Sequence, residues 1–258
     1  MIDLHMHTNY SGDATDSLIG LLKKAEEAKL ECISITDHDT CEVYEEMKSI
    51  DVSKYYTGKM IRGCEFTTTI NGEGIELIGY NVDTDWLNLE LPKTYKYSYP
   101  ELQEFSTIRL IEICKAEGVV IDEEAIDLNA KISVREMHRE IVRHEENRKF
   151  IKDERAWNSP SPFFREHVNN SDNIFFVDKT DWFPTLGETV ELIRRAQGLV
   201  FIPHIFAYGE KAMKIFKELT ENYHIDGIEC HHEQHSKEET EFLVQYCKEH
   251  NLYISRRK

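Results

Sequence analysis

The chain has few of the features that mark secreted and membrane proteins. Its six cysteines form no Cys-x-x-Cys pair and no regular spacing, which is typical of reduced thiols rather than of a disulfide framework. The longest apolar run, residues 199–206, is broken by Pro203 and His204 and is too short to cross a bilayer. The amino terminus has no basic segment followed by an apolar one, so it does not resemble a signal peptide. We therefore expect a cytoplasmic protein with no membrane partner.

Positive charge is also scarce. The 31 Lys and Arg residues face 48 Asp and Glu residues, which gives a net charge of −17. The field of such a surface repels a phosphate backbone, so we expect no stable nucleic-acid partner. An acidic protein that handles anions needs local positive charge, and bound cations supply it. The length of 258 residues and the 40% hydrophobic content predict a folded chain, either one large domain or a core domain with an insertion.

Short apolar segments alternate with amphipathic ones along much of the chain. The apolar runs predict strands at 2–7, 32–36, 60–66, 75–80, 174–177, 199–203, 225–230 and 252–254. Helical spacing predicts helices at 17–29, from about 41, and at 186–196, 210–220 and 238–250. Repeated βα units predict an α/β fold with a mostly parallel sheet, closed as a barrel or left open.

The rhythm changes between about residues 85 and 172. Long helices are predicted at 100–116 and 133–152, with few strand signals and many charges. We predict a barrel domain formed by residues 1–84 and 173–258, and a helical insertion at 85–172 that serves as a lid or substrate subdomain. The alternative is a pair of crossover helices with long loops.

Side chains that bind metals follow the first two predicted strands. His5 and His7 stand at i and i+2 on one strand, so both point to the same face. Asp13 lies in the turn that follows. The second strand ends in Asp37-His38-Asp39, where His38 is the expected ligand and Asp37 could orient a ligating imidazole. For Asp39 we expect a simpler role, as the N-cap of the next helix.

Further strands end in the same residue types. Glu65 lies at the end of the third strand, and His204 and His235 follow later ones. Barrel active sites are assembled from the carboxyl ends of several strands, so the joint occurrence predicts one site. Mixed imidazole and carboxylate ligands suit Mn, Zn or Fe, and the sequence does not rank these metals.

At this point the residues resemble a known family, the PHP (polymerase and histidinol phosphatase) metal-dependent phosphoesterases. The matching segments are D-L-H-M-H-T-x-x-S-x-D at 3–13, I-T-D-H-D at 35–39, G-C-E-F at 63–66, F-I-P-H at 201–204 and G-I-E-x-x-x-x-x-H at 227–235. The resemblance implies a distorted seven-stranded (β/α) barrel that holds two or three divalent metal ions. It also implies the ligands His5, His7, Asp13, His38, Glu65, His204 and His235. The predicted insertion resembles that of the nucleotide-phosphatase branch, in which it supplies substrate contacts.

Two positions depart from the family pattern. Glu76 stands where the family often has histidine, and we count it as a ligand because a carboxylate also binds such cations. The family's last strand runs into a Gly-Ser-Asp-x-His motif with two further ligands. Here the sequence continues from Ser255 into Arg256-Arg257-Lys258 without that motif. Because two ligands of the family pattern are missing, we expect the site to hold fewer metal ions or to bind them more weakly.

The predicted insertion carries candidate phosphate ligands. Arg135, His138 and Lys179 are the residues that we expect to contact the substrate, with Arg135 and His138 on one helix face. The alternative for the arginines of this helix is an exposed face paired with Glu136, Glu140 and Glu145.

The predicted function is hydrolysis of a phosphate monoester of a small metabolite or nucleotide. A metal-activated water attacks phosphorus, and solvent, Asp37 or His204 protonates the leaving oxygen. One alternative is a histidinol-phosphate phosphatase. The other is a non-catalytic metal- or phosphate-binding module, which the absent motif and Glu76 favour. The sequence leaves the oligomeric state open.

Overall fold

The computed structural model describes residues 1–258, and its contacts divide the chain into two compact units. The first unit consists of Met1–Thr68, Ile75–Tyr95 and Pro184–Lys258. The second consists of Thr69–Gly74 and Lys96–Phe183. These bounds differ by several residues from the domain boundaries that the sequence predicts at 84/85 and 172/173, and that domain assignment stays a prediction. No helix in either unit has the length and apolar content needed to span a membrane.

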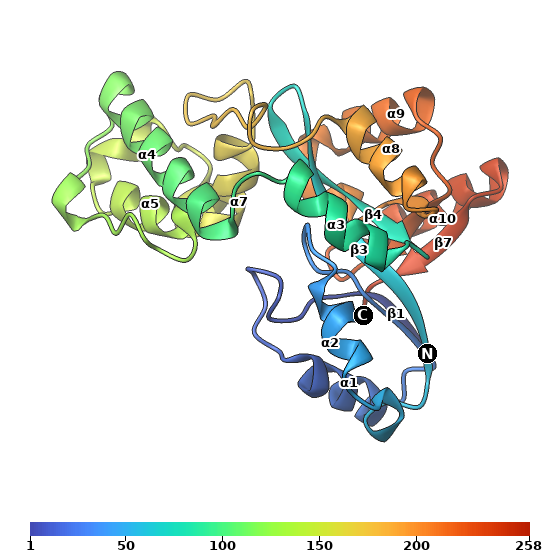
Figure 1. Ribbon diagram of the computed structural model, residues 1–258. Coiled ribbons are helices and arrows are strands. Elements are labelled where there is room, and N and C mark those ends of the chain that lie inside the picture. Colours follow the sequence, from blue (N-terminus) through green and yellow to red (C-terminus); the bar gives the residue numbers. More distant parts are fainter. The chain divides into compact units, whose positions relative to one another are not determined.

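A single seven-stranded sheet forms the centre of the first unit (Figure 1). In sheet order its strands are β1 (Ile2–Met6), β2 (Cys32–Ile35), β3 (Lys59–Ile70), β4 (Glu73–Tyr80), β5 (Leu199–Ile202), β6 (Gly227–His231) and β7 (Tyr253–Arg256). Strands β1 to β3 pair in parallel, as do β5 to β7, whereas β4 pairs antiparallel with β5. Because β7 also contacts β1, the sheet is a nearly closed barrel, which confirms the predicted α/β barrel class.

The helices of the first unit follow from clear capping and burial patterns. Ser17 caps α1 (Leu18–Glu27), and its side chain accepts a hydrogen bond from the backbone of Gly20. Capping boxes begin α8 (Leu186–Arg195) and α10 (Lys237–His250), where a Thr or Ser side chain and a Glu three residues later satisfy each other's backbone groups. The α-helices are α1 (Leu18–Glu27), α2 (Glu42–Lys48), α3 (Thr84–Thr94), α8 (Leu186–Arg195), α9 (Ala212–Asn222) and α10 (Lys237–His250), with 3-10 segments η1 (Val52–Lys54) and η5 (Ile205–Lys211).

A small apolar cluster packs β1, β4 and β5 together. Leu4, Ile78, Tyr80 and Phe201 are buried together, and the rings of Tyr80 and Phe201 meet edge to face at 4.8 Å. The hydroxyl of Tyr80 donates to the carbonyl oxygen of Leu4 at 2.8 Å. This packing fixes β1 against β4 directly next to the position of His5.

The second unit is mainly helical and has a core of its own. Its elements are α4 (Tyr99–Glu117), η2 (Glu123–Ala125), α5 (Ser133–Val142), η3 (Glu145–Lys149), α6 (Glu154–Asn158), α7 (Pro160–Phe163) and the π-helical turn η4 (Phe164–Val168). Buried residues from these helices and from the segment that follows them form one hydrophobic cluster around Leu110, Met137, Phe163 and Phe175.

Two predicted elements in this unit are wrong. The predicted strand at 174–177 is irregular, because the side chain of Asn173 accepts from the backbone of Phe175 and turns the chain. The predicted helix at 133–152 ends at Val142. The side-chain amide of Asn147 donates hydrogen bonds to the carbonyl oxygens of Val120 and Ile141. These bonds compete with continuation of the helix.

Candidate functional site

The buried carboxylate of Glu65 is the centre of the candidate site. Four imidazoles direct Nε2 at it, at 2.9 Å from His5, 3.3 Å from His7, 3.5 Å from His38 and 2.8 Å from His204. His5 and His7 come from the end of β1, His38 follows β2, and His204 follows β5. The sequence therefore predicted correctly that these strand ends lie together, and their role as metal ligands stays a prediction.

The imidazoles form a continuous row. Successive ring centroids lie 4.8 Å apart from His38 to His7, 5.0 Å from His7 to His5 and 5.4 Å from His5 to His204. The row then continues past Glu65 from His204 to His232 at 5.6 Å and on to His235 at 5.3 Å.

The donor set fits a cation. Ligand atoms of His5, His7 and Glu65 lie within 4.8 Å of one another, and so do those of His7, Asp13 and His38. Burial alone would lower the pKa of His5, but the carboxylates of Glu65 and Glu229 raise it to about 10. Burial lowers the pKa of the neighbouring His7 to about 3. Imidazole nitrogens and carboxylate oxygens at these separations are the donor atoms that bind divalent metals in proteins.

Glu229, on β6, is a site residue that the sequence reasoning missed. One carboxylate oxygen lies 3.0 Å from Nδ1 of His5, and the other accepts from the backbone N–H of His204 at 2.9 Å. The attraction of His5 lowers the pKa of the fully buried Glu229 to about 2, although burial by itself would raise it. The available signal was a glutamate inside the otherwise apolar strand G-I-E-C.

His204 has an unusual backbone conformation. Its φ of 20° and ψ of 46° lie in a region that non-glycine residues seldom occupy. The backbone N–H of His204 donates to the carboxylate of Glu229, and Nε2 of its ring is hydrogen-bonded to the carboxylate of Glu65. Nδ1 of His204 is buried without a hydrogen-bond partner. Strained backbone held by surrounding contacts is typical of functional sites.

Asp37 and Asp39 have different partners from those expected. The carboxylate of Asp37 accepts from the backbone N–H and the hydroxyl of Thr8, both at 2.6 Å, rather than from a ligating imidazole. Its predicted role as a proton donor stays a prediction. The N-cap assignment of Asp39 is wrong, because Cys41 is the N-cap of α2 and Asp39 accepts from the N–H and hydroxyl of Thr67 at 2.7 Å each.

The remaining predicted ligands lie around the cluster. Asp13 approaches Nε2 of His38 at 3.8 Å. The carboxylate of Glu76 accepts a short hydrogen bond from the phenol of Tyr208, whose oxygen accepts from the N–H of Glu76 at 2.9 Å. Nδ1 of His235 lies 3.2 Å from the carbonyl oxygen of Cys230. Glu76 is thus fixed by a phenol that the sequence reasoning did not single out.

The predicted phosphate ligands Arg135, His138 and Lys179 belong to the second unit. Arg135 is exposed. His138 is buried, and its Nε2 donates to the carbonyl oxygen of Ala156 at 2.9 Å. Lys179 donates to the side-chain oxygen of Asn169 at 2.6 Å. Their contact with substrate stays a prediction.

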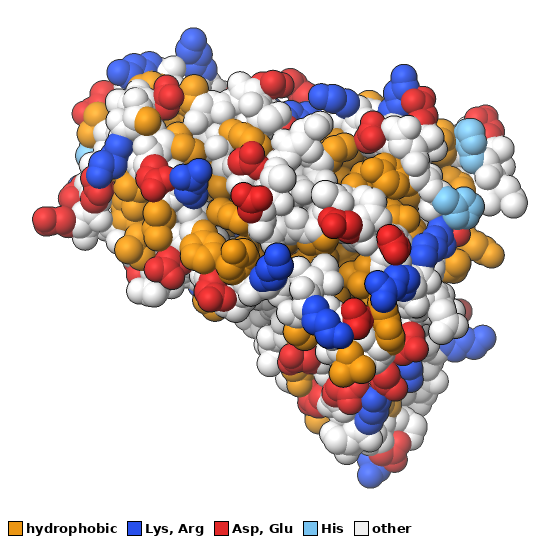
Figure 2. Space-filling model, turned by 45° about the horizontal axis from the view of Figure 1, so that its top comes forward, with side chains coloured by type: hydrophobic (Ala, Val, Ile, Leu, Met, Phe, Trp, Pro, Cys, Tyr) orange, Lys and Arg blue, Asp and Glu red, His pale blue; other side chains and the backbone are white.

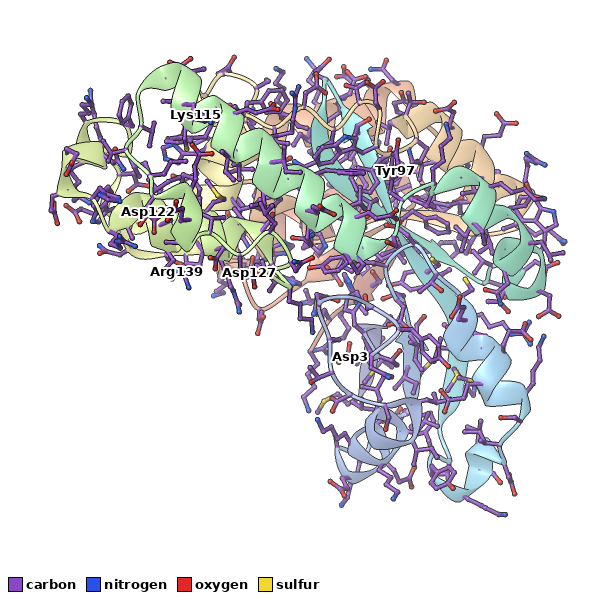
Figure 3. The ribbon with its side chains drawn as sticks, turned by 60° about the vertical axis from the view of Figure 1, so that its left-hand side comes forward. Asp3, Tyr97, Lys115, Asp122, Asp127 and Arg139 are labelled. Carbon is purple, nitrogen blue, oxygen red and sulfur yellow. The ribbon has the colours of Figure 1, made fainter.

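Other arginines of α5 pair with glutamates of the same helix. Arg139 bonds Glu136 at 2.5 Å, and Arg143 bonds Glu140 at 3.0 Å. Figure 3 labels Arg139 together with Asp122 and Asp127 of the segment before α5. The backbone N–H groups of Asp122 and Asp127 donate to Glu140 and Glu136 respectively. For these two arginines the structure favours the alternative of a paired helix face.

Comparisons with known proteins agree with this architecture. The model of the PHP domain family matches residues 3–157, which is more than half of the chain. An uncharacterized protein of Methanocaldococcus jannaschii is 34% identical over 101 residues, which cover 35% of this chain and 53% of that protein. The chain thus spans about half the length of this curated relative.

Two solved structures share the fold. An amidohydrolase from Chromobacterium violaceum, with bound sulfate and no metal, has a TM-score of 0.66 at 18% identity, covering 100% of this chain and 86% of that one. A candidate metal-dependent phosphoesterase from Bifidobacterium adolescentis has a TM-score of 0.60 at 17% identity, covering 99% and 86%. At these identities the likeness shows the fold alone.

Proposed function

The chain belongs to the PHP domain family, and from this premise we propose that it is a metal-dependent hydrolase acting on phosphate monoesters. The substrate is a small phosphorylated metabolite or a nucleotide. The observation that carries the proposal is the arrangement around Glu65, where four Nε2 atoms lie 2.8–3.5 Å from one carboxylate.

Each side chain of the cluster has a definite task in this reaction. His5, His7 and Glu65 would hold one cation, and His7, Asp13 and His38 would hold another. Bound divalent cations supply a hydroxide at neutral pH and neutralise the phosphoryl oxygens. With a cation on Nε2 of His5, Glu229 would accept the remaining ring proton from Nδ1 and so fix the orientation of the imidazole.

Phosphate is the oxyanion that best suits the chain. The sulfate in the Chromobacterium structure shows that a protein of this fold can hold a tetrahedral dianion. On the face shown in Figure 2, basic side chains are mixed with acidic ones rather than gathered in a patch. A small substrate that enters a cation site suits such a surface better than a long polyanion does.

The six free cysteines support a reducing, cytoplasmic location.

The test combines metal content with turnover. The purified protein is loaded separately with Mn, Zn and Fe and is assayed on p-nitrophenyl phosphate, nucleoside monophosphates, histidinol phosphate and an N-acyl amino acid. We expect turnover of monoesters, and the variant Glu65→Gln is expected to lose both bound metal and activity. The control is Glu233→Gln, which makes the same change at an exposed loop residue.

The outcomes separate the alternatives. Preference for histidinol phosphate would assign that substrate, and turnover of the amide alone would replace phosphate chemistry with amide hydrolysis. Stoichiometric metal without turnover of any substrate would favour a binding module. Full activity in a His5→Ala, His38→Ala, Glu65→Ala triple variant would refute the proposal.

A further inference from the structure

The loop between β1 and α1 buries one hydroxyl that has no part in the reaction proposed above. Within residues 9–17, Ser11 is the only buried residue, with 1% of its surface exposed. Its backbone N–H donates to the carbonyl oxygen of Thr8 at 2.9 Å, and its carbonyl oxygen accepts from the N–H of Ala14 at 3.2 Å. These two bonds fix the backbone on both sides of the hydroxyl, so the fold of the loop sets its position.

The hydroxyl of Ser11 contacts two histidines of the candidate site. The backbone N–H of His38 donates to Oγ at 3.1 Å, and Nδ1 of His7 lies 3.3 Å from it. Nε2 of His7 lies 3.3 Å from the carboxylate of Glu65, so Ser11 contacts the ring nitrogen that does not face Glu65. A hydroxyl can both donate and accept, and the contact with His7 is therefore open to either tautomer of the ring.

Asp13 is the third partner of this hydroxyl. Burial by itself would raise the pKa of the Asp13 carboxylate, but the imidazoles of His38 and His7 and a hydrogen bond with the side chain of Ser11 lower it. His7, Asp13 and His38 form one of the two groups whose ligand atoms lie within 4.8 Å of one another. Ser11 therefore contacts every member of this group.

The three ligands are not fixed by direct bonds to one another. Asp13 and Nε2 of His38 are 3.8 Å apart, which is too far for a hydrogen bond. The side chain of Asp13 is 46% exposed, so water and salt screen its attraction to the imidazoles. The rings of His7 and His38 are stacked at 4.8 Å between centroids, and stacking leaves them free to slide. An additional contact is needed to hold the set in one arrangement.

We propose that Ser11 is a positioning residue, whose hydroxyl holds His7, Asp13 and His38 in the arrangement that binds one of the two cations. Partners that contact a metal ligand from outside orient it, and losing one typically lowers metal affinity 10- to 100-fold. The inference rests on the proposed function, because that function requires the same cation site. It adds a residue whose effect is on one ion of the pair, since the other group, formed with His5 and Glu65, shares only His7 with this one.

The test compares two serine hydroxyls of the same loop. Ser11→Ala removes the hydroxyl that contacts the three ligands. Ser17→Ala is the matched control, because it removes the hydroxyl that caps α1 by accepting from the N–H of Gly20 at 3.2 Å. Losing a helix cap destabilises the fold, so this control separates a loss of stability from a loss of positioning. Native mass spectrometry counts the Mn ions on each chain, and competition with a metal-binding dye gives the stepwise dissociation constants.

We expect the wild-type protein to bind at least two ions. In Ser11→Ala one dissociation constant should rise about 10- to 100-fold and the other should rise less, because the two groups share one ligand. Ser17→Ala should keep both constants at their wild-type values. Unchanged constants in Ser11→Ala would overturn the inference. Equal weakening in the two variants would also overturn it, because the cause would then be the stability of the loop.

Turnover separates this inference from the proposed function. A wild-type protein that binds two ions and hydrolyses no monoester would refute the proposed function alone, and the dissociation constants would still decide the role of Ser11. Hydrolysis of monoesters together with unchanged metal binding in Ser11→Ala would refute only the role of Ser11. A wild-type protein that binds no ion would refute both.

Discussion

The imidazole of His5 lies between Glu229 and Glu65. A carboxylate oxygen of Glu229 lies 3.0 Å from its Nδ1, and a carboxylate oxygen of Glu65 lies 2.9 Å from its Nε2. The other oxygen of Glu229 accepts from the N–H of His204. A single carboxylate from β6 thus contacts the imidazole of His5 on β1 and the backbone of His204 at the end of β5. Such outer contacts fix the tautomer of a ligand and raise its basicity.

Replacing Glu229 should weaken metal binding without removing a ligand atom. Glu229→Gln keeps the size of the side chain but removes the charge that favours a proton on Nδ1 of His5. We expect metal affinity to fall about 10- to 100-fold, the usual cost of losing an outer carboxylate. The measurement is a competition titration with a metal-binding dye. Glu233→Gln should match wild type, and an unchanged affinity in Glu229→Gln would mean that Glu229 only supports packing.

Bound metal should stabilise the fold. A cation that binds the native cluster and not the unfolded chain adds about 2.7 kcal/mol at a concentration 100 times its dissociation constant. For a chain of this size the thermal midpoint should rise by roughly 5–10 °C. Calorimetry with and without Mn, before and after treatment with a chelator, measures the shift. Glu65→Gln serves as the control, and an equal shift in that variant would place the ion elsewhere.

Protonation of two buried histidines should destabilise the second unit in acid. His138 and His167 pack on the ring of Phe163, each at 5.4 Å between centroids. Burial lowers the pKa of both. Below about pH 6.5 the unfolded chain therefore takes up protons that the folded chain does not, so the free energy of unfolding falls as pH decreases from this value. Above it, both states carry neutral rings and the contribution is constant.

Urea unfolding at pH 7.5 and 5.5 measures this effect. For wild type each histidine contributes a loss of up to about 1.4 kcal/mol per pH unit in this window. His167→Gln should reduce the difference between the two pH values. His224→Gln, at a side chain that is 82% exposed, should leave it as in wild type. An identical difference in all three proteins would show that these buried rings do not control acid stability.

The residues that the sequence located best are those at the ends of strands. His5, His38 and His204 lie at or just after strand ends, and parallel pairing brings such ends together. Glu65, predicted at a strand end, lies inside β3, which continues to Ile70. Their convergence could be predicted because it depends on topology. The partners of these residues could not be predicted, because Glu229 and Tyr208 contact site residues that lie more than a hundred positions away in the sequence. The predicted N-cap role of Asp39 failed because Thr67, which lies 28 residues further along the chain, donates to its carboxylate.

The end of α5 shows a second limit of prediction from local sequence patterns. Helical spacing located α4 correctly. It did not predict that the side chain of Asn147 donates to the carbonyl oxygens of Val120 and Ile141. Helix α5 therefore ends at Val142. Polar side chains that bond distant backbone groups end regular structure at places that apolar periodicity does not mark.

The close approach of β2 and β3 requires a glycine at position 63. A Cβ atom there would lie 2.6 Å from Oγ of Ser34 and 2.8 Å from Cγ2 of Thr36, closer than atoms can pack. We expect Gly63→Ala to lower the free energy of unfolding by about 1–3 kcal/mol, as overpacking in a core does.

A double-mutant cycle tests the cause. Oγ of Ser34 is buried without a partner, so Ser34→Ala alone should be neutral or stabilising. In the Gly63→Ala background the same change should restore part of the lost stability, because it removes the nearer of the two clashes. Strictly additive free energies would show that Ser34 is not what restricts position 63. Coupling would show that steric fit here sets the spacing of β2 and β3 close to the bridge that pairs His38 with Glu65.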